Sequence, residues 1–158
     1  MVKPKAAVLR VEAALAAAGI ESEVLHTPES ARTAEEAAAT IGTTVAQIVK
    51  SLVFTCDGAP VLALVSGTNR LDTKALGALA GGRIERADAD LVRSATGYAI
   101  GGIPPLGHAT SLPTWIDRDL LAFDVIWAAA GTPTDVFPVA PEALVRASGG
   151  IVADIKSR

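Results

Sequence analysis

The stretch KSLVFTCDGAPVLALV, residues 50–65, predicts a β-hairpin around which the fold is built. Residues 51–55 are rich in β-forming side chains, and Asp57-Gly58 is a strong signal for a two-residue hairpin turn. Residues 61–65 are expected to form the returning strand, with Pro60 at its first edge, where a missing backbone donor is tolerated. The chain should therefore contain at least one antiparallel pair of strands.

Helix and strand signals alternate on both sides of this hairpin. Apolar spacing, glycine stops and a Thr33–Glu36 capping box predict helices over residues 4–18, 33–41, 44–48, 72–80, 88–95 and 141–147. Further strands are expected over residues 24–26, around Ile84, and over 125–129, 134–139 and 151–152. The pattern indicates an α+β fold, a single domain over residues 1–158 with a curved, mixed, largely antiparallel sheet flanked by helices.

Composition limits the classes of partner. The chain has 158 residues, 14 of them basic and 17 acidic, for a net charge of −3. This balance argues against binding DNA or another polyanion over a long footprint, because such binding needs many cations on one face. Brief contact with the end of a nucleic acid is still compatible with it.

The cysteine and histidine inventory argues against a metal or another cofactor. Cys56 is the only cysteine, so no intramolecular disulfide can form, and His26 and His108 show no metal-ligand spacing. Cys56 is therefore expected to be a structural thiol. No apolar stretch is long enough to span a bilayer and no signal peptide is evident, so we expect a soluble cytoplasmic protein without a membrane partner.

Two segments could carry chemistry. Lys50 could be an ordinary solvated charge, but it follows a helix and opens an apolar strand, a position from which its ammonium can look into a cleft. The sequence GYAIGGIPPLGH, residues 97–108, is either an elaborate turn or a rigid surface loop. In the second reading the amides of Gly101 and Gly102 approach a ligand closely.

Other polar residues are weaker candidates. His26 and His108 could line the same pocket from the early strand and from the end of the loop. Asp117 and Asp135 occur in turn-like or strand-edge settings, where a carboxylate is usually solvated. The sequence contains no Gly-x-Ser-x-Gly elbow, Walker loop or dinucleotide fingerprint, which disfavours serine-hydrolase and nucleotide-cofactor chemistry.

Four segments, taken in order, resemble one known family. They are residues 33–38, residues 47–54 with Lys50, the Arg70-Leu71-Asp72-Thr73-Lys74 helix start, and the Gly97–Gly107 loop. Together they are similar to the YbaK/ProX (YbaK/EbsC) family of aminoacyl-tRNA trans-editing deacylases, which is related to the editing insertion domain of bacterial prolyl-tRNA synthetase. The resemblance covers nearly the whole chain and implies the fold of that domain.

The resemblance implies a trans-editing hydrolase that deacylates mischarged tRNA, with Cys-tRNA(Pro) or a similar small amino acid as substrate. The ribose 2′-hydroxyl of the substrate would assist ester hydrolysis, so no protein nucleophile or cofactor is needed. The partners implied are the aminoacyl-tRNA acceptor end and, as a further candidate, prolyl-tRNA synthetase. By matching positions, the catalytic residues would be Lys50, Gly101 and Gly102, and the substrate-binding candidates are Pro105, Asp135, His26, Tyr98 and His108.

One departure and one alternative accompany this expectation. Some family members place a tyrosine in the early pocket, whereas residues 23–27 of this chain contain none, so the amino acid that is removed is not fixed by the resemblance. The alternative is a non-catalytic module that uses the same pocket to bind a nucleotide, an aminoacyl group or a synthetase.

Overall fold

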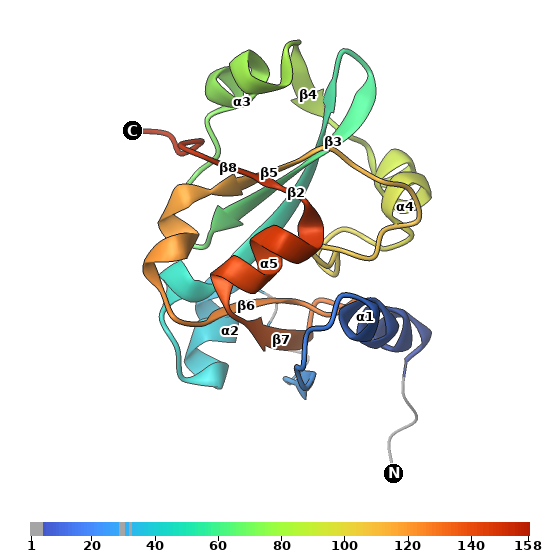
Figure 1. Cartoon of the computed structure of the whole chain (residues 1–158), viewed down its shortest axis with the longest axis vertical. Coiled ribbons are helices and arrows are strands. Elements are labelled where there is room, and N and C mark those ends of the chain that lie inside the picture. The colour runs from blue at the N-terminus through green and yellow to red at the C-terminus, as the bar shows by residue number, and fades with distance from the viewer. Residues whose placement is uncertain (1–4, 29–30, 32) are drawn as a thin grey trace.

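The predicted hairpin lies at the centre of the fold (Figure 1). The structure is a computed structural model, and it describes residues 5–28, 31 and 33–158. Strand β2 (Val49–Cys56) pairs antiparallel with β3 (Ala59–Ser66), and Val53 lies opposite Leu62. Asp57 and Gly58 both have positive φ, 51° and 87°, as a tight turn between twisted strands requires. The hairpin prediction is confirmed.

The strands of the described residues divide between two sheets. The five-stranded sheet has the order β4-β2-β3-β5-β8 and is mixed, because β3 pairs parallel with β5 and β5 pairs parallel with β8. The three-stranded sheet has the order β1-β7-β6 and is antiparallel. The remaining bounds are β1 Leu25–His26, β4 Ile84–Arg86, β5 Thr114–Asp117, β6 Ile126–Ala129, β7 Asp135–Val139 and β8 Ile151–Ala153. The α+β class is confirmed, although one sheet was expected and β5 was not predicted.

In the described part of the chain, five α-helices surround the sheets, as expected for this class. They are α1 Ala6–Ala17, α2 Ala34–Ile41, α3 Thr73–Ala80, α4 Ala89–Thr96 and α5 Pro141–Ser148, and short 3₁₀ turns cover Val45–Gln47 and Arg118–Ala122. The Thr33–Glu36 capping box forms at the start of α2, where the Glu36 amide donates to Thr33 Oγ1 at 3.1 Å. Local signals of this kind position helix ends because they satisfy backbone amides that have no partner within the helix.

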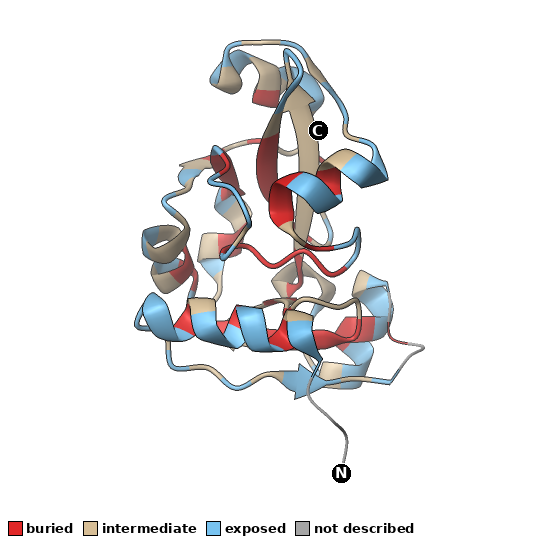
Figure 2. Cartoon of the chain, turned by 90° about the vertical axis from the view of Figure 1, so that its right-hand side faces the viewer, coloured by how far each residue is buried: buried red, intermediate tan, exposed pale blue. Residues whose placement is uncertain are grey.

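Alternation along β3 creates two hydrophobic cores. Leu62 and Leu64 join a cluster with residues of α1, α4 and α5, while Val61, Ala63 and Val65 join one with residues of α3. Along α1, buried residues alternate with exposed ones, and the buried ones are Val8, Val11 and Leu15 (Figure 2). Each fully buried aliphatic side chain contributes about 1.5–3 kcal/mol. The two faces of the five-stranded sheet are therefore covered by different helices.

Candidate active site

A stretch of β2 has a free edge. Strand β4 pairs with β2 only through Phe54, Thr55 and Cys56, so residues 49–53 have no ladder partner on that side among the described residues. A pocket of about 290 Å³ lies along this edge. Four consecutive residues, Val49 to Leu52, line it. Since successive side chains point to opposite faces of a sheet, this means that the pocket meets the strand edge-on.

Apolar side chains, several of them alanines, form most of the pocket. The walls come from α2, β2, β6, β7 and nearby loop residues. They include Ala31, Ala34, Ala37, Ile48, Ile100, Trp127, Ala128, Ala129, Pro133 and Val136. Its polar side chains are Thr33, Lys50 and Ser51. The volume is at the low end of the range for ligand pockets. The site therefore suits a small group with an apolar part and one reactive or charged end.

Lys50 brings a cation to the mouth of the pocket. The side chain is partly buried, and its Nζ donates a hydrogen bond to the backbone carbonyl of Asn69. Burial lowers the pKa of Lys50; the nearby Glu35 and Asp117 carboxylates oppose this shift, and the Arg70 guanidinium adds to it. Because the ammonium is partly removed from water, it interacts more strongly with an anion than a fully solvated lysine would.

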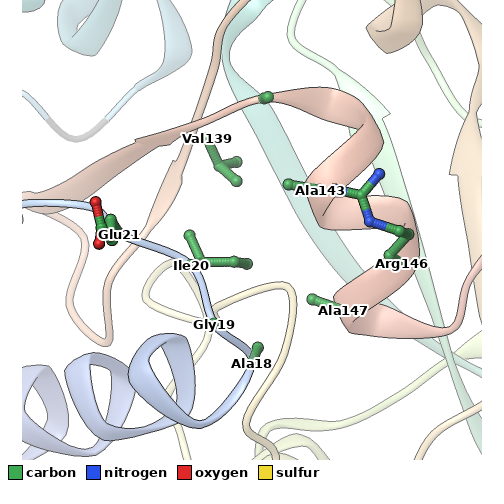
Figure 3. A pocket seen from close by; sticks show the side chains of 9 residues that line it. Ala18, Gly19, Ile20, Glu21, Val139, Ala143, Arg146 and Ala147 are labelled. Atoms are coloured by element: carbon green, nitrogen blue, oxygen red, sulfur yellow. The ribbon is translucent and has the colours of Figure 1, made fainter.

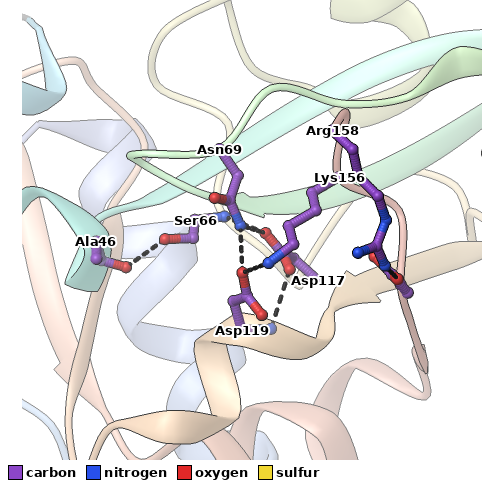
Figure 4. A network of polar contacts seen from close by, with 8 residues as sticks. Ala46, Ser66, Asn69, Asp117, Asp119, Lys156 and Arg158 are labelled. Carbon is purple, nitrogen blue, oxygen red and sulfur yellow. Dashed lines mark hydrogen bonds and ion pairs between the residues drawn. The ribbon is translucent and has the colours of Figure 1, made fainter.

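A network of polar contacts fixes Asn69, whose backbone carbonyl accepts the Lys50 hydrogen bond (Figure 4). Asn69 Nδ2 donates to Asp117 Oδ2 and to Asp119 Oδ2, at 2.8 Å each. Asp117 also accepts from the amides of Ser66 and Asp119, both at 3.0 Å. Lys156 Nζ lies 2.8 Å from Asp119 Oδ2, and the hydrogen bonds from Lys156 and Asn69 lower the pKa of Asp119. The expectation of a solvated carboxylate is wrong for Asp117, which is buried at 1% exposure.

The glycine loop brings one of its two candidate glycines to the pocket. Gly101 lines it with a φ of +94°, is exposed, and its amide has no acceptor among the described residues. Gly102 is buried, and its amide donates to the Ala99 carbonyl at 3.0 Å. A Cβ on Gly102 would lie 2.7 Å from the carbonyl oxygen of Gly131. The expectation of a surface loop therefore applies to Gly101, and Gly102 serves backbone packing.

Three other residues of the predicted site lie away from the pocket. Tyr98 is buried in the larger core, where the Arg10 guanidinium lies 4.6 Å from its ring centroid. Burial raises the pKa of Tyr98. Pro105 and His108 line a separate hollow, and His108 Nε2 lies 2.7 Å from the Pro104 carbonyl oxygen. Burial lowers the pKa of His108, although that backbone contact opposes the shift. These three residues shape the loop that presents Gly101.

Asp135 joins three distant segments. Its buried carboxylate accepts hydrogen bonds from Lys5 Nζ at 3.1 Å and from Thr132 Oγ1, and it contacts His26 Nδ1. Burial alone would raise the pKa of Asp135, but the hydrogen bonds from Thr132, His26 and Lys5 hold it below the ordinary value. The solvated setting expected for Asp135 is wrong. Asp135 and His26 do not line the pocket, whereas the neighbouring Pro133 and Val136 do.

Of the predicted site residues, only Lys50 and Gly101 line the pocket, so sequence reasoning missed most of its wall, including Trp127 and Ser51. Trp127 reaches the pocket from β6, beside the isolated bridge that joins it to Ile48. Ser51 follows Lys50, and its Oγ is buried without a hydrogen-bond partner among the described residues. No local pattern marks Trp127, because its position depends on how the second sheet packs. Ser51 could have been singled out only by its position next to Lys50.

A different hollow, larger than the β2 pocket at about 520 Å³, lies between the end of α1, β7 and α5 (Figure 3). Its lining consists mainly of small apolar residues, with Glu21 and Arg146 as charged groups, and none of the predicted site residues belongs to it. In the part of the chain that the structure describes, no group of three or more His, Cys, Asp or Glu residues could hold a metal ion. Within the same residues, no helix has the length and apolarity to cross a membrane.

Comparisons with known proteins identify the family. Proline–tRNA ligases of several bacteria match part of the chain; that of Maridesulfovibrio salexigens is 37% identical over 104 residues, which are 65% of this chain and 18% of the ligase. The "Uncharacterized protein YwhH" of Bacillus subtilis is 30% identical over 125 residues, covering 78% of this chain and 80% of that protein. The "Putative Cys-tRNA(Pro)/Cys-tRNA(Cys) deacylase EbsC" of Enterococcus faecalis is 29% identical over 127 residues, covering 79% and 77%.

A solved structure matches nearly all of the chain. The crystal structure of "a putative trans-editing enzyme for prolyl tRNA synthetase" superposes with a TM-score of 0.95 at 44% identity, covering 99% of this chain and 100% of that one. The family model described as "Aminoacyl-tRNA editing domain" matches residues 28–147, which include the whole β2 pocket and the glycine loop. The chain belongs to the aminoacyl-tRNA editing domain family.

Proposed function

We propose that the protein is a deacylase that hydrolyses the ester between a small, wrongly attached amino acid and the 3′-terminal adenosine of a tRNA. The observation that carries this proposal is the pocket of about 290 Å³ on the free edge of β2, with Lys50 and the exposed Gly101 amide at its boundary. Family membership supports the activity. The size of the pocket and the name of the EbsC relative favour a small side chain, with cysteine on tRNA(Pro) as the first substrate to test.

The chemistry requires few protein groups. Water adds to the ester carbonyl carbon, and negative charge develops on the carbonyl oxygen. The Gly101 amide donates to that oxygen, and the partly desolvated Lys50 ammonium stabilises the charge. The bond from the carbonyl carbon to the ribose oxygen then breaks and that oxygen takes up a proton, which leaves a free amino acid and an uncharged tRNA end.

The absence of a base fits assistance by the substrate. Among the described residues that line the pocket there is no histidine and no carboxylate. Thr33 and Ser51 have hydroxyl groups, but no histidine or carboxylate among the described lining residues is available to activate them as nucleophiles. We therefore assign the proton transfers to the ribose 2′-hydroxyl and water, as the family resemblance implies.

The alternative function is a non-catalytic module that binds an aminoacyl group or a nucleotide. A deacylation assay separates the two functions. tRNA(Pro) charged with cysteine, alanine, serine or proline is incubated with the protein, and the remaining ester is measured against a no-protein control. We expect faster loss of at least one small noncognate amino acid and retention of proline. Unchanged ester lifetimes across the panel would contradict the proposal.

The partner proposed for the site is the aminoacyl-tRNA acceptor end. Prolyl-tRNA synthetase is a further candidate, supported by the similarity to part of proline–tRNA ligases. Association with a synthetase would raise the effective concentration of freshly mischarged tRNA around the pocket. Because this substrate is made and used where translation occurs, we propose that the protein acts in the cytoplasm.

A further inference from the structure

Another hollow adjoins the active-site pocket at β2, on the face of the five-stranded sheet that carries α3. It has a volume of about 650 Å³, and Lys50 and Leu52 line both spaces. The other lining residues are Phe54, Gly67, Thr68, Asn69, Arg70, Leu71, Thr73 and Arg86. The two spaces therefore meet at Lys50, and we call the second one the β2 groove.

The strand register places the groove's cations and its aromatic ring on one face. Lys50, Leu52 and Phe54 alternate along β2, so their side chains point to the same side. Arg86 lies directly opposite Phe54 in the β2–β4 ladder and shares that face. At about 3.4 Å per residue, Lys50 and Phe54 are about 14 Å apart along the strand, which makes the groove an extended track.

The groove is basic although the protein is acidic. Three cations line it, Lys50, Arg70 and Arg86, and no acidic residue does, in a chain of net charge −3. Arg70 and Arg86 are exposed and make no ion pair with any described acidic side chain. The acidic residues Asp72 and Glu85, which are near Arg70 and Arg86 in sequence, make other contacts. The Asp72 carboxylate caps α3, and Glu85 lies near Arg83.

The backbone beneath Arg70 is held in place. The Ser157 amide donates to the Arg70 carbonyl at 2.7 Å, and the Asp72 amide donates to the Ile155 carbonyl at 2.8 Å. The neighbouring Asn69 side chain is fixed by Asp117 and Asp119. Arg70 and Lys50 therefore line the same groove from a fixed backbone, and an anionic ligand that contacts both would reduce the repulsion between them.

We propose that the β2 groove binds the single-stranded RNA nucleotides that precede the 3′-terminal aminoacylated adenosine, an inference that rests on the proposed deacylase function. Arg70 and Arg86 contact phosphates, and Phe54 offers a half-buried ring on which a base stacks. Cations along a track with an aromatic platform are the features by which proteins hold single strands without reading their sequence. Lys50, at the junction, serves both the RNA end and the ester.

The test measures RNA binding directly, with no acylated substrate. The probe is a fluorescent single-stranded RNA of about five nucleotides that ends in CCA, a length within the site sizes of single-strand grooves. Fluorescence anisotropy at low ionic strength gives Kd for the wild type, Arg70→Ala, Arg86→Ala and Phe54→Leu. We expect each arginine variant to weaken binding about ten-fold or more. Each should also reduce the salt slope by about 0.7, as expected when one phosphate contact to a single strand is lost.

Phe54→Leu separates stacking from charge. We expect it to weaken binding about five-fold or more while leaving the salt slope unchanged, because it removes the ring and no cation. The matched control is Arg93→Ala, which removes an exposed arginine from α4, the helix that packs on the opposite face of the five-stranded sheet. It should bind like the wild type. Thermal melts of all variants verify that they are folded.

Two outcomes would contradict the proposal that the β2 groove binds RNA. One is that the wild type does not bind the RNA, and the other is that both arginine variants keep the wild-type Kd and salt slope. A deacylation assay run in parallel keeps the two proposals apart. A wild type that binds the RNA through Arg70 and Arg86 but hydrolyses no aminoacyl-tRNA supports the groove and contradicts the deacylase. A wild type that hydrolyses the ester while the arginine variants bind RNA normally supports the deacylase and contradicts the groove.

Discussion

Lys50 Nζ donates its hydrogen bond to the backbone carbonyl of Asn69 and not to a carboxylate. A carbonyl orients the ammonium without neutralising it, so the positive charge stays available to a substrate. The Asn69 side chain is in turn fixed by Asp117 and Asp119. This chain of contacts converts a flexible lysine into a directed cation at the junction of the pocket and the groove.

Replacing Lys50 with Ala should lower kcat/KM for deacylation about ten- to a hundred-fold, because a charge-assisted contact is worth about 1.5–3 kcal/mol. Lys50→Arg should restore only part of the rate, since a planar fork does not reproduce a compact ammonium. Single-turnover assays on mischarged tRNA measure both variants. Normal turnover by the alanine variant would remove Lys50 from the mechanism.

Asp117→Asn should reduce both stability and activity. Asp117 Oδ1 accepts the Asp119 amide, while Oδ2 accepts the Ser66 amide and Asn69 Nδ2. An asparagine has only one oxygen, so at least one buried donor faces an NH₂ group, at a cost of about 1–3 kcal/mol. Each kcal/mol lowers Tm by roughly 2–4 °C in a protein of this size.

Asp119→Asn is the milder counterpart, because the Asp119 side chain is 42% exposed and its ion pair with Lys156 lies at the surface. The two variants are compared by thermal melt and by kcat/KM. If both variants changed Tm and kcat/KM equally, or if a destabilised Asp117→Asn protein kept full activity, Asp117 would not be a residue that positions Lys50.

Gly101→Val should abolish most activity and leave the protein folded. A Cβ at Gly101 would lie 3.4 Å from Pro133, which is ordinary contact, but a φ of +94° is strained for valine and the side chain would crowd the free amide. Loss of one oxyanion donor costs about 2.7–4 kcal/mol, or roughly a hundred- to a thousand-fold in rate. Deacylation is measured together with a thermal melt. A folded variant with normal turnover would show that the loop has no catalytic role.

Gly102→Val and Leu106→Ala provide the contrast. A Cβ at Gly102 would lie only 2.7 Å from the Gly131 carbonyl oxygen, so valine there should unfold the loop or the protein. Leu106 is 7% exposed in the larger core, and its truncation should cost about 2–5 kcal/mol of stability. Both should show their main effect in the melt.

Neither a metal nor a thiol should be needed for turnover. Cys56 Sγ lies 3.8 Å from the Ala80 carbonyl oxygen, at the far end of β2 from the pocket, and belongs to the periphery of the smaller core. Treatment with a chelator and the Cys56→Ser substitution should each leave kcat/KM within a few-fold of the untreated wild type. Complete loss in either arm would require a different mechanism.

Asp135 should contribute to acid sensitivity. Its pKa in the folded state is lower than in the unfolded chain, so its contribution to stability is present above the unfolded value, near 3.9, and is lost as pH falls through the lower folded value. Urea unfolding of the wild type and Asp135→Asn from pH 7 to pH 3 checks this. The difference in unfolding free energy should shrink below roughly pH 4. A difference that is constant across the range would exclude the linkage.

Local chemistry made much of the fold predictable. Asp57-Gly58 specifies its turn and Thr33 with Glu36 specifies a helix start through contacts between neighbours in sequence. The location of Lys50 beside a cleft was also predictable, because it heads an apolar strand. What the sequence could not predict depends on distant pairing. Asp117 is buried because β5 runs parallel between β3 and β8, and this pairing leaves no local pattern.

The same limit applies to the site. Gly101 and Gly102 look equivalent in sequence, and only the approach of the Gly131 backbone distinguishes them. Trp127 becomes a pocket wall because the second sheet meets the beginning of β2 through the Ile48–Trp127 bridge. The sequence resemblance identified the family because it compares residues in order and does not need these contacts.

The free edge of β2 also bears on how the protein behaves in solution at high concentration. An uncovered strand edge is a template on which another chain can add a strand, and such edges promote self-association. Here α2, Trp127 and the Ile100–Gly101 segment stand over residues 49–52 and leave about 290 Å³, room for a small group but not for a foreign strand. The packing that shapes the reaction space therefore also shields the edge, and substitutions that widen the pocket for larger substrates should make the protein more prone to aggregate.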